Sequence, residues 1–234
     1  MVEVAQPIVL YSLDTVPYEP ALEIQEQLRN ARIQDEIEDA LIVLQHPPVI
    51  TTGVSGGLED LRVTPSQLGA MGIELCEASR GGKATFHGPG QLVAYPVFKL
   101  TDRDLLTYLW RLEETIIRTL AGWGIQAGRD ERYPGVWVGE RKICAIGIGV
   151  REDVTMHGLA LNANTELAYF DLFTPCGISD RGVTSMQSLL GHRIDMQILE
   201  ADLVQAFSAV FGRRMLRAQS AVLEQLLNLS TAAC

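Results

Sequence analysis

The spacing of apolar residues along this 234-residue chain predicts a series of strands and three amphipathic helices. Short apolar or alternating runs bounded by turn residues are typical of strands, and apolar residues three and four apart are typical of helices. The expected strands cover residues 7–13, 40–44, 49–52, 91–98 and 155–162, with a hairpin over 133–154 around Gly139 and Glu140. The expected helices cover residues 20–30, 104–120 and 199–211, and the tail after Arg217 can form a short fourth one.

The order of these elements predicts the fold class. Strands and helices mix without the strict strand–helix–strand alternation that a doubly wound parallel sheet requires. We therefore expect an α/β (α+β) fold with a mixed β-sheet flanked by helices. The length is typical of one large domain, and no internal repeat or long linker divides residues 1–234. For the expected helix over residues 104–120, Thr101 or Asp102 can cap the start, and Gly122 follows the end.

Charge and cysteine usage exclude several classes of function. The net charge of -10 argues against nucleic-acid binding, because nucleic-acid-binding domains are usually basic. No apolar run has the length that a membrane span needs, and the acidic N-terminus is unlike a secretion signal or a transit peptide. The four cysteines match no zinc or redox spacing. We therefore expect a cytoplasmic protein with free thiols, no metal site, and no nucleic-acid or membrane partner.

The glycine-rich segment over residues 80–96 is the most informative part of the sequence. It places Arg80, Lys83 and His87 among closely spaced glycines and prolines, and it runs directly into an expected strand. Glycines let a backbone come close to a ligand, while Arg, Lys and His bring charge and proton chemistry to the same place. This combination predicts a binding loop on a rigid scaffold.

Two other glycine motifs have competing interpretations. Residues 53–57 match the G-x-S-x-G nucleophile elbow, which makes Ser55 a candidate hydrolase nucleophile. The sequence after Gly57 is a poor start for the long helix that this elbow requires, so a solvent-exposed turn is the alternative. Gly147 and Gly149 form half of a dinucleotide-binding fingerprint, without a third glycine or a following helix. They are instead suited to clear one face of a strand for a ligand.

Cys176 is the best candidate nucleophile among the cysteines. Pro175 and Gly177 define a turn that would display the thiol, because proline fixes its own backbone angle and glycine permits unusual ones. Cys76 and Cys144 lie in apolar or strand contexts that are typical of a core. The sequence therefore favours chemistry at Cys176 over chemistry at the other thiols.

A cysteine nucleophile needs a nearby cation or base, because an unperturbed thiol has a pKa of about 8.5. The candidates for this role are Lys142, Lys83, His87 and His157. Lys142 lies beside apolar residues of an expected strand, an unusual place for a long charged side chain. A lysine that protects an edge strand from aggregation is the alternative. His157 can equally be a core histidine.

Five separate blocks resemble the signature of the lipoyl(octanoyl) transferase family in both order and spacing, over roughly residues 8–212. These blocks are residues 45–49, 80–95, 142–143, 157–162 and 174–178. The resemblance implies a fold shared with biotin and lipoate protein ligases. The tail over residues 213–234 carries no motif and is not covered by the resemblance.

The resemblance also implies the site residues. Cys176 would hold the acyl group as a thioester, and Lys142 would lower the pKa of its thiol. The acyl pocket would be lined by Arg80, Gly81, Gly82, Lys83, Ala84, Thr85, Phe86, His87, Ala145, Ile146, Gly147, Gly158, Leu159 and Ala160. Lys83 stands at a variable position of the motif and receives no individual role. Backbone N–H groups near Cys176 or in the Gly81–Gly82 loop are alternative oxyanion-hole donors.

The implied activity is the first step of protein lipoylation. An octanoyl or lipoyl group would pass from acyl carrier protein to a specific lysine of a lipoyl domain. The acceptors would be the lipoyl domains of 2-oxoacid dehydrogenase complexes and the glycine cleavage H protein. No cofactor is expected, and the chain is expected to be a monomer. Because both partners are acidic in their families, docking would need a local arginine patch, for which the candidates are Arg80, Arg141, Arg151 and Arg181.

Three rival functions stay open at this point. An ATP-dependent lipoate or biotin protein ligase would share the fold but would need no cysteine. A serine hydrolase would use Ser55, and an acyl-binding protein with an inactive site would use neither residue.

Overall fold

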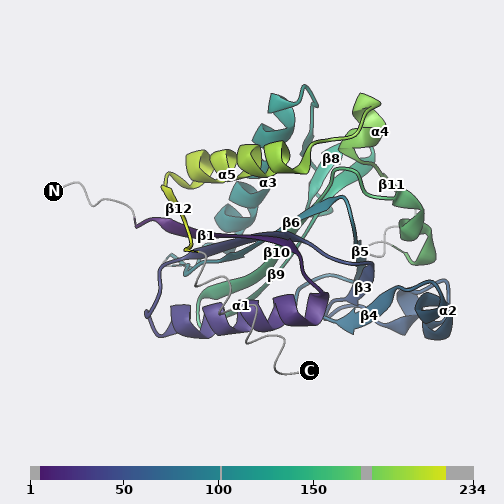
Figure 1. Ribbon diagram of the computed structural model, residues 1–234, viewed down its shortest axis with the longest axis horizontal. Helices are drawn as coiled ribbons and strands as arrows, with labels where there is room; N and C mark the ends of the chain where they lie inside the picture. Colours follow the sequence, from purple (N-terminus) through teal and green to yellow (C-terminus); the bar gives the residue numbers. More distant parts are fainter. Residues whose placement is uncertain (1–5, 101, 175–180, 220–234) are drawn as a thin grey trace.

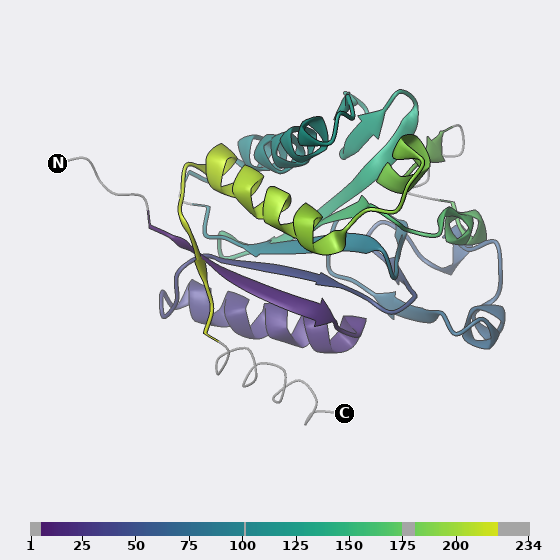
Figure 2. The same ribbon diagram turned by 45° about the horizontal axis from the view of Figure 1, so that its top comes forward.

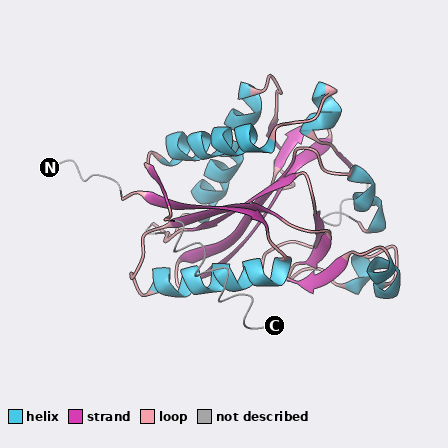
Figure 3. Ribbon diagram, in the orientation of Figure 1, coloured by secondary structure: helices cyan, strands magenta, loops and turns pink. Residues whose placement is uncertain are grey.

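The computed structural model describes residues 6–100, 102–174 and 181–219, which form a large mixed sheet, a small sheet and helices on both faces of the large one (Figure 1, Figure 3). The strands are β1 (Ile8–Thr15), β2 (Ala40–Gln45), β3 (Val49–Thr52), β4 (Glu74–Glu77), β5 (Ala84–His87), β6 (Gln91–Val97), β7 (Gly128–Arg129), β8 (Val136–Val138), β9 (Arg141–Arg151), β10 (Val154–Asn162), β11 (Gly182–Val183) and β12 (Met215–Arg217). The α-helices are α1 (Tyr18–Ile33), α2 (Pro65–Ala70), α3 (Leu105–Gly122), α4 (Met186–Leu190) and α5 (Met196–Phe211), and the 3-10 helices are η1 (Leu58–Asp60) and η2 (Leu167–Leu172).

The large sheet has the strand order β12-β1-β2-β6-β10-β9-β8-β7, with β11 added beside β9. The β1 strand runs parallel to both β12 and β2, and β11 runs parallel to β9. The remaining pairs, β2–β6, β6–β10, β10–β9, β9–β8 and β8–β7, are antiparallel. The small sheet has the order β4-β3-β5. The expected mixed sheet flanked by helices is therefore confirmed.

Helices cover both faces of the large sheet (Figure 2), and an apolar layer on each face holds them there. On one face, Ile24 and Leu28 of α1 pack on β2 and β6, whereas α3 and α5 cover the other face. Leu112, Ile116 and Leu120 of α3 are all 0% exposed, as the apolar spacing of that helix predicts. Burying one such side chain stabilises the fold by about 1.5–3 kcal/mol. Within the described ranges, no helix combines the length and apolar character needed to cross a membrane.

The expected elements differ from the observed ones mainly at their ends. Helix α1 begins at Tyr18, because Pro17 takes the capping position and Pro20 is tolerated in the first turn. Helix α3 is capped by Asp104, whose carboxylate accepts the N–H of Thr107 at 3.0 Å, and not by Asp102. The other expected cap, Thr101, and the tail from residue 220 onward lie outside the described residues.

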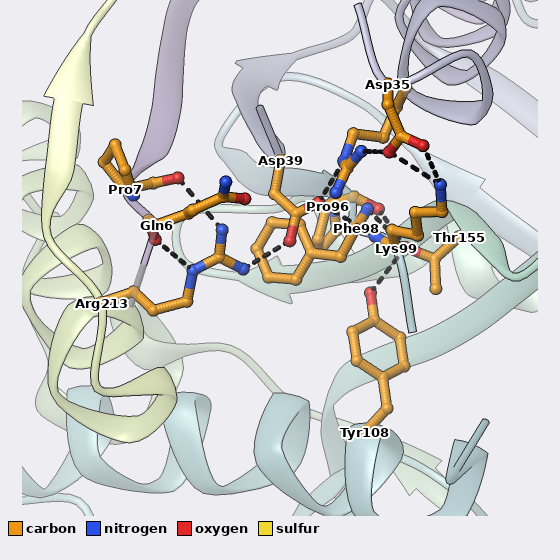
Figure 4. A network of polar contacts seen from close by, with 11 residues as sticks. Gln6, Pro7, Asp35, Asp39, Pro96, Phe98, Lys99, Tyr108, Thr155 and Arg213 are labelled. Atoms are coloured by element: carbon orange, nitrogen blue, oxygen red, sulfur yellow. Dashed lines mark hydrogen bonds and ion pairs between the residues drawn. The ribbon is translucent and has the colours of Figure 1, made fainter. Parts of the chain in front are cut away.

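The start of the tail is part of the domain although no motif covers it. β12 pairs with β1 at the end of the fold opposite the small sheet (Figure 1), and Arg213 ties the two segments together (Figure 4). Its guanidinium donates to the carbonyl oxygens of Gln6 at 2.6 Å and Pro7 at 3.0 Å, and it pairs with Asp39. Residues 213–219 therefore complete the edge of the sheet and do not form a separate extension.

Candidate active site

One cavity gathers residues from the glycine-rich segment and from the middle of β9 and β10. It encloses about 460 Å³ of empty space, including its open mouth. The residues expected to line an acyl pocket that do line this cavity are Arg80, Gly81, Gly82, Thr85, His87, Ala145, Ile146, Gly147, Gly158, Leu159 and Ala160. Tyr18, Tyr95 and His157 line it as well.

Three of the expected lining residues point elsewhere. β5 is a strand, so its side chains alternate between two faces, and Thr85 faces the cavity while Ala84 and Phe86 pack into the apolar cluster below η2. Phe86 stacks there on Tyr169, with ring centroids 4.6 Å apart. Lys83 extends away from the cavity and pairs with the carboxylate of Asp60. From the sequence, the glycine-rich segment was expected to be an irregular loop. A strand, in which successive side chains face opposite sides, would have separated Thr85 from Ala84 and Phe86.

Arg80 holds the cavity-lining loop together from inside. Its guanidinium donates to the carbonyl oxygens of Gly81 at 3.1 Å and Lys83 at 2.9 Å, and to the carbonyl and hydroxyl oxygens of Thr51, both at 2.7 Å. The residue is only 8% exposed. Arg80 therefore braces the loop and cannot belong to a surface patch for docking, contrary to the expectation from the sequence.

The other candidate arginines do not form a single patch either. Arg141 and Arg151 are the two ends of β9, about 33 Å apart at the usual rise of a strand. Arg181 lies near Arg141 only, because the next residue, Gly182, pairs with Arg141 in the sheet. Of the four candidates, only Arg141 and Arg181 therefore lie at the same end of β9.

The glycines of β9 make room for the protein's own loop. A Cβ on Gly147 would lie 3.1 Å from the Gly81 carbonyl oxygen, and one on Gly149 would lie 2.9 Å from the Ser79 carbonyl oxygen. The expected cleared face exists, but residues 79–81 occupy much of it. The N–H of Gly81 donates to the Ile148 carbonyl oxygen at 2.9 Å, so this amide is already used and is a poor oxyanion-hole donor.

A buried histidine stands behind the cavity and fixes the tyrosine beside it. Nδ1 of His46 lies 2.7 Å from the Val16 carbonyl oxygen, so Nδ1 carries the proton, and Nε2 accepts from the Tyr95 hydroxyl at 2.8 Å. Burial lowers the pKa of His46 to about 4. The ring is therefore neutral at pH 7.

His87 faces the cavity as a neutral ring. Its Nδ1 lies 2.8 Å from Oε1 of Gln91, whose amide nitrogen donates to the Phe86 carbonyl oxygen and to Asn162. The Gln91 oxygen is therefore the acceptor, Nδ1 of His87 is the donor, and Nε2 keeps its lone pair. Burial, then His46 and the positive charge of Arg80, hold the pKa of His87 well below its usual value. This ring is suited to line an apolar cavity without charge.

His157 is held in a backbone conformation that the sequence does not reveal. It has φ of 60°, in the left-handed region, inside the otherwise extended β10. Its N–H donates to Oε1 of Gln25 at 2.9 Å, and its Nε2 lies 3.0 Å from the Ser79 hydroxyl. Burial, with smaller contributions from Arg80 and Arg29, lowers its pKa to about 3. His157 is thus a neutral brace between α1 and the residue that precedes Arg80.

Lys142 lies on β9, three residues before Ala145, or about 10 Å along the strand. The strand is flanked by β10 on one side and by β8 and β11 on the other, so the edge-strand interpretation of this lysine is wrong. The ammonium donates to the Pro134 carbonyl oxygen at 3.1 Å and lies 4.9 Å from the centre of the Trp137 ring. Lys142 is only 8% exposed, at the start of a central strand whose middle lines the cavity.

Cys176 lies outside the described residues, but both flanks of its segment are described. Before it, the N–H of Thr174 donates to the Asp60 carbonyl oxygen at 2.8 Å. After it, Val183 pairs directly with Lys142 in the sheet, and the N–H of Thr184 donates to the Lys142 carbonyl oxygen at 2.9 Å. The chain therefore returns to Lys142 within a few residues of Cys176.

The two described cysteines are unsuited to nucleophilic chemistry at neutral pH. Cys144 is completely buried, and burial holds the pKa of its thiol well above the usual value. Burial, together with Glu19 and Glu74, raises the pKa of Cys76 to about 11. Their expected role as core residues fits these values, although Cys76 is only partly buried.

The G-x-S-x-G segment is not a nucleophile elbow. η1, which follows it, has three residues, and the elbow requires a long helix. The N–H groups of Val54 and Ser55 donate to the carbonyl oxygens of Arg80 at 3.0 Å and Gly82 at 3.2 Å, while the Ser55 residue is exposed. This turn therefore supports the cavity-lining loop. No group of three or more metal-binding side chains occurs among the described residues.

Comparison with known proteins identifies the family. The model of the lipoyl protein ligase A/B catalytic domain matches residues 17–208. An octanoyltransferase of Caldicellulosiruptor saccharolyticus is 44% identical over 221 residues, which cover 93% of this chain and 94% of that protein. An octanoyltransferase of a Thermoanaerobacter species (strain X514) is 49% identical over 202 residues, which cover 86% of this chain and 88% of that protein.

Solved structures share the fold at much lower identity. A lipoate-protein ligase A bound with ATP superposes with a TM-score of 0.75 at 18% identity, covering 95% of this chain and 92% of that chain. A bi-partite lipoate protein ligase from Thermoplasma acidophilum also gives a TM-score of 0.75 at 18% identity, covering 95% and 91%. From its fold, its sequence relatives and the cavity built by its motif residues, this chain belongs to the lipoyl protein ligase A/B catalytic domain family.

Proposed function

We propose that this chain is an octanoyltransferase of protein lipoylation. It transfers an octanoyl or lipoyl group from acyl carrier protein to a lysine of a lipoyl domain, through a thioester on Cys176. The observation that carries the proposal is the cavity of motif residues on β9 and β10, with Lys142 on the same strand and next to the chain that returns from Cys176. The octanoyltransferase names of relatives that match most of the chain support the same activity.

The first step forms the acyl-enzyme. The Cys176 thiolate attacks the carbonyl carbon of the donor thioester, the bond to the carrier sulfur breaks, and the carrier thiolate leaves and takes a proton from the Lys142 ammonium, which becomes neutral. The Lys142 ammonium favours the thiolate because an opposite charge within about 4–6 Å lowers the pKa of a thiol. The octanoyl tail lies in the cavity, whose neutral histidines can line an apolar chain without the desolvation cost of a buried charge.

The second step forms the amide. The acceptor lysine has a pKa of about 10.4 and must lose a proton before its amine can attack the thioester. That proton goes to solvent, the amine attacks the acyl carbon, neutral Lys142 takes the second proton from the attacking nitrogen as a general base, and the Cys176 sulfur leaves as thiolate. The proton that Lys142 gained restores the starting pair, so the cycle closes without ATP.

Partner docking is proposed at the end of β9 that carries Lys142. Arg132 and Arg141 are exposed there, and Arg181 packs over Tyr133 and Trp137 at 5.8 and 5.2 Å. Arg181 is already paired with Asp130 at 2.5 Å, so Arg132 and Arg141 are the charges that would receive acidic carriers, namely the acyl carrier protein and the lipoyl domains of 2-oxoacid dehydrogenase complexes or the glycine cleavage H protein. We further propose that the protein acts in the cytoplasm as a monomer, without a cofactor.

The second candidate function is ATP-dependent ligation of lipoate, which the shared fold favours. A ligase would activate a free acid with ATP and would leave no acyl group on cysteine. An inactive acyl-binding protein would fill the cavity and also leave no covalent adduct.

The deciding experiment is intact-mass analysis after incubation with octanoyl–acyl carrier protein in the absence of ATP. We expect the mass of one octanoyl group to be added to the wild-type chain. The adduct should disappear in Cys176→Ser and persist in the matched control Cys76→Ser, which alters a half-buried thiol of high pKa. No adduct on the wild type, or an adduct that survives Cys176→Ser, would contradict the proposal.

A further inference from the structure

An ion pair outside the cavity connects the cavity-lining loop to the 3-10 helix η1. The Lys83 ammonium lies 3.2 Å from Oδ1 of Asp60, while Oδ2 of Asp60 accepts the N–H of Gly57 at 3.3 Å. The Asp60 side chain is only 5% exposed, whereas that of Lys83 is 39% exposed. A carboxylate buried to this degree needs a positive partner, and Lys83 supplies one from the loop that Arg80 braces.

The backbone of the same aspartate holds the chain that leads to the nucleophile. The Asp60 carbonyl oxygen accepts the N–H of Thr174 at 2.8 Å, and the N–H of Arg62 donates to the Leu172 carbonyl oxygen at 2.8 Å. Between these two bonds, Leu61 and Phe173 form an isolated antiparallel bridge. Thr174 stands two positions before Cys176 in the sequence. Asp60 therefore contacts Lys83 of the cavity-lining loop through its side chain, and Thr174, which leads to Cys176, through its backbone.

The two contacts are packed too closely to move independently. Gly56 lies between them, and a Cβ on it would be 2.5 Å from Oδ2 of Asp60 and 2.9 Å from Cα of Lys83. A few residues earlier, the N–H of Gly53 donates to the Lys83 carbonyl oxygen at 3.3 Å. The glycine turn, the acyl-binding loop and η1 therefore interlock, and a displacement of one shifts the others.

We propose that Asp60 is a positioning residue for the acyl transfer. With Lys83, it keeps the cavity-lining loop in register with the segment that carries Cys176. An acyl chain in the cavity then presents its carbonyl carbon to the Cys176 sulfur. The inference rests on the proposed octanoyl transfer. Breaking the pair leaves the carboxylate of Asp60 buried without its cation, and the resulting shift of η1 reaches Thr174 through the backbone.

The expected signature is a loss of chain-length selectivity. An octanoyl thioester has an alkyl chain that the cavity can hold, whereas an acetyl thioester has only a methyl group and gains little from the cavity. A misplacement of about 1 Å can cost on the order of 100-fold in rate. Lys83→Met and Asp60→Asn should therefore slow acylation by the octanoyl donor by about tenfold or more and slow the acetyl donor much less.

The first test measures the rate of Cys176 acylation with both donors by rapid quench and intact mass. Lys83→Arg should restore selectivity, and the double variant should be no worse than either single one, because the pair acts as a unit. The matched control is Lys99→Met, which removes a lysine–aspartate pair with Asp35, at 2.6 Å, remote from the site (Figure 4). An unchanged ratio of the two rates in Lys83→Met and Asp60→Asn would overturn the proposal.

A second test does not depend on activity. Hydrogen exchange over residues 172–174 should become on the order of tenfold faster in Lys83→Met, although Lys83 touches none of these residues, and should stay unchanged in Lys99→Met. Unchanged exchange in Lys83→Met would show that the linkage is absent. A wild-type chain that forms no octanoyl adduct would instead contradict the proposed function, while the exchange measurement would still decide on the linkage.

Discussion

Replacing Arg80 by Met should destabilise the domain strongly, although the residue lines a ligand cavity. The substitution keeps an unbranched apolar stem and removes the guanidinium that donates to four oxygens. The two oxygens on Thr51 lie on a residue that is 0% exposed, so water cannot replace the lost donors there. Each buried acceptor left without a donor costs about 1–3 kcal/mol, so these two oxygens alone cost about 3 kcal/mol.

Urea denaturation at pH 7 measures this loss directly. A loss of about 3 kcal/mol corresponds to a Tm lower by about 6–12 °C for a domain of this size. Arg80→Lys should fall between Met and the wild type, because one ammonium cannot reach both Thr51 and the loop carbonyls. The matched control is Arg118→Met, which removes an exposed pair with Glu114 and should change stability by about 0.5 kcal/mol or less. If Arg80→Met lies within about 1 kcal/mol of the wild type, the bracing role is wrong.

Three further predictions concern the thiol, pH and the glycine turn. Lys142→Met should slow alkylation of Cys176 by iodoacetamide at neutral pH, and an unchanged rate would refute the thiolate-stabilising role of Lys142. Acid should destabilise the fold below pH of about 6.5, because the unfolded histidines then take up protons, with pKa of about 6.5, that the folded ones with lowered pKa refuse. The rings concerned are those of His46, His87 and His157. Between pH 6.5 and 5.5, each should lower the free energy of unfolding by about 1 kcal/mol. In urea titrations, His157→Gln should therefore remove about a third of this pH dependence. Ser55→Ala should leave the rate of acyl transfer within about twofold of the wild type, because the exposed Ser55 supports the cavity-lining loop only through its backbone. A complete loss of transfer would instead favour a role of Ser55 as a hydrolase-type nucleophile.

The secondary structure was predictable wherever one face of an element meets the core. The hairpin of β8 and β9 turns at Gly139 and Glu140 as expected, because its alternating apolar residues pack on α3. The same logic failed for β5, since its four residues are all buried, two toward the cavity and two toward a second apolar cluster. Its sequence, Ala84-Thr85-Phe86-His87, does alternate in polarity, but a run of four residues after two glycines is too short to distinguish from a loop.

The residue types in the site were predictable, but the direction of their side chains was not. An arginine in a glycine-rich loop was expected to meet a ligand or an acidic partner, and Arg80 is instead directed at backbone carbonyls inside the protein. Charge alone does not distinguish these cases, because a guanidinium is satisfied equally by a carboxylate and by several carbonyl oxygens. Likewise, nothing in the sequence marks His157 for a left-handed backbone conformation within a strand.

The glycines show why composition identified the site before its chemistry could be assigned. A glycine signals that something approaches the backbone closely, without saying what approaches. At Gly147 and Gly149 it is the loop at residues 79–81, and at Gly56 it is the Lys83–Asp60 pair. These contacts fix the acyl-binding loop before a ligand arrives, so binding does not have to order the loop, and affinity is not reduced by that entropic cost. A cavity assembled in this way selects its ligand by the position of the wall, which is why small changes at Asp60 or Arg80 should alter chain-length selectivity more than they alter the thiol itself.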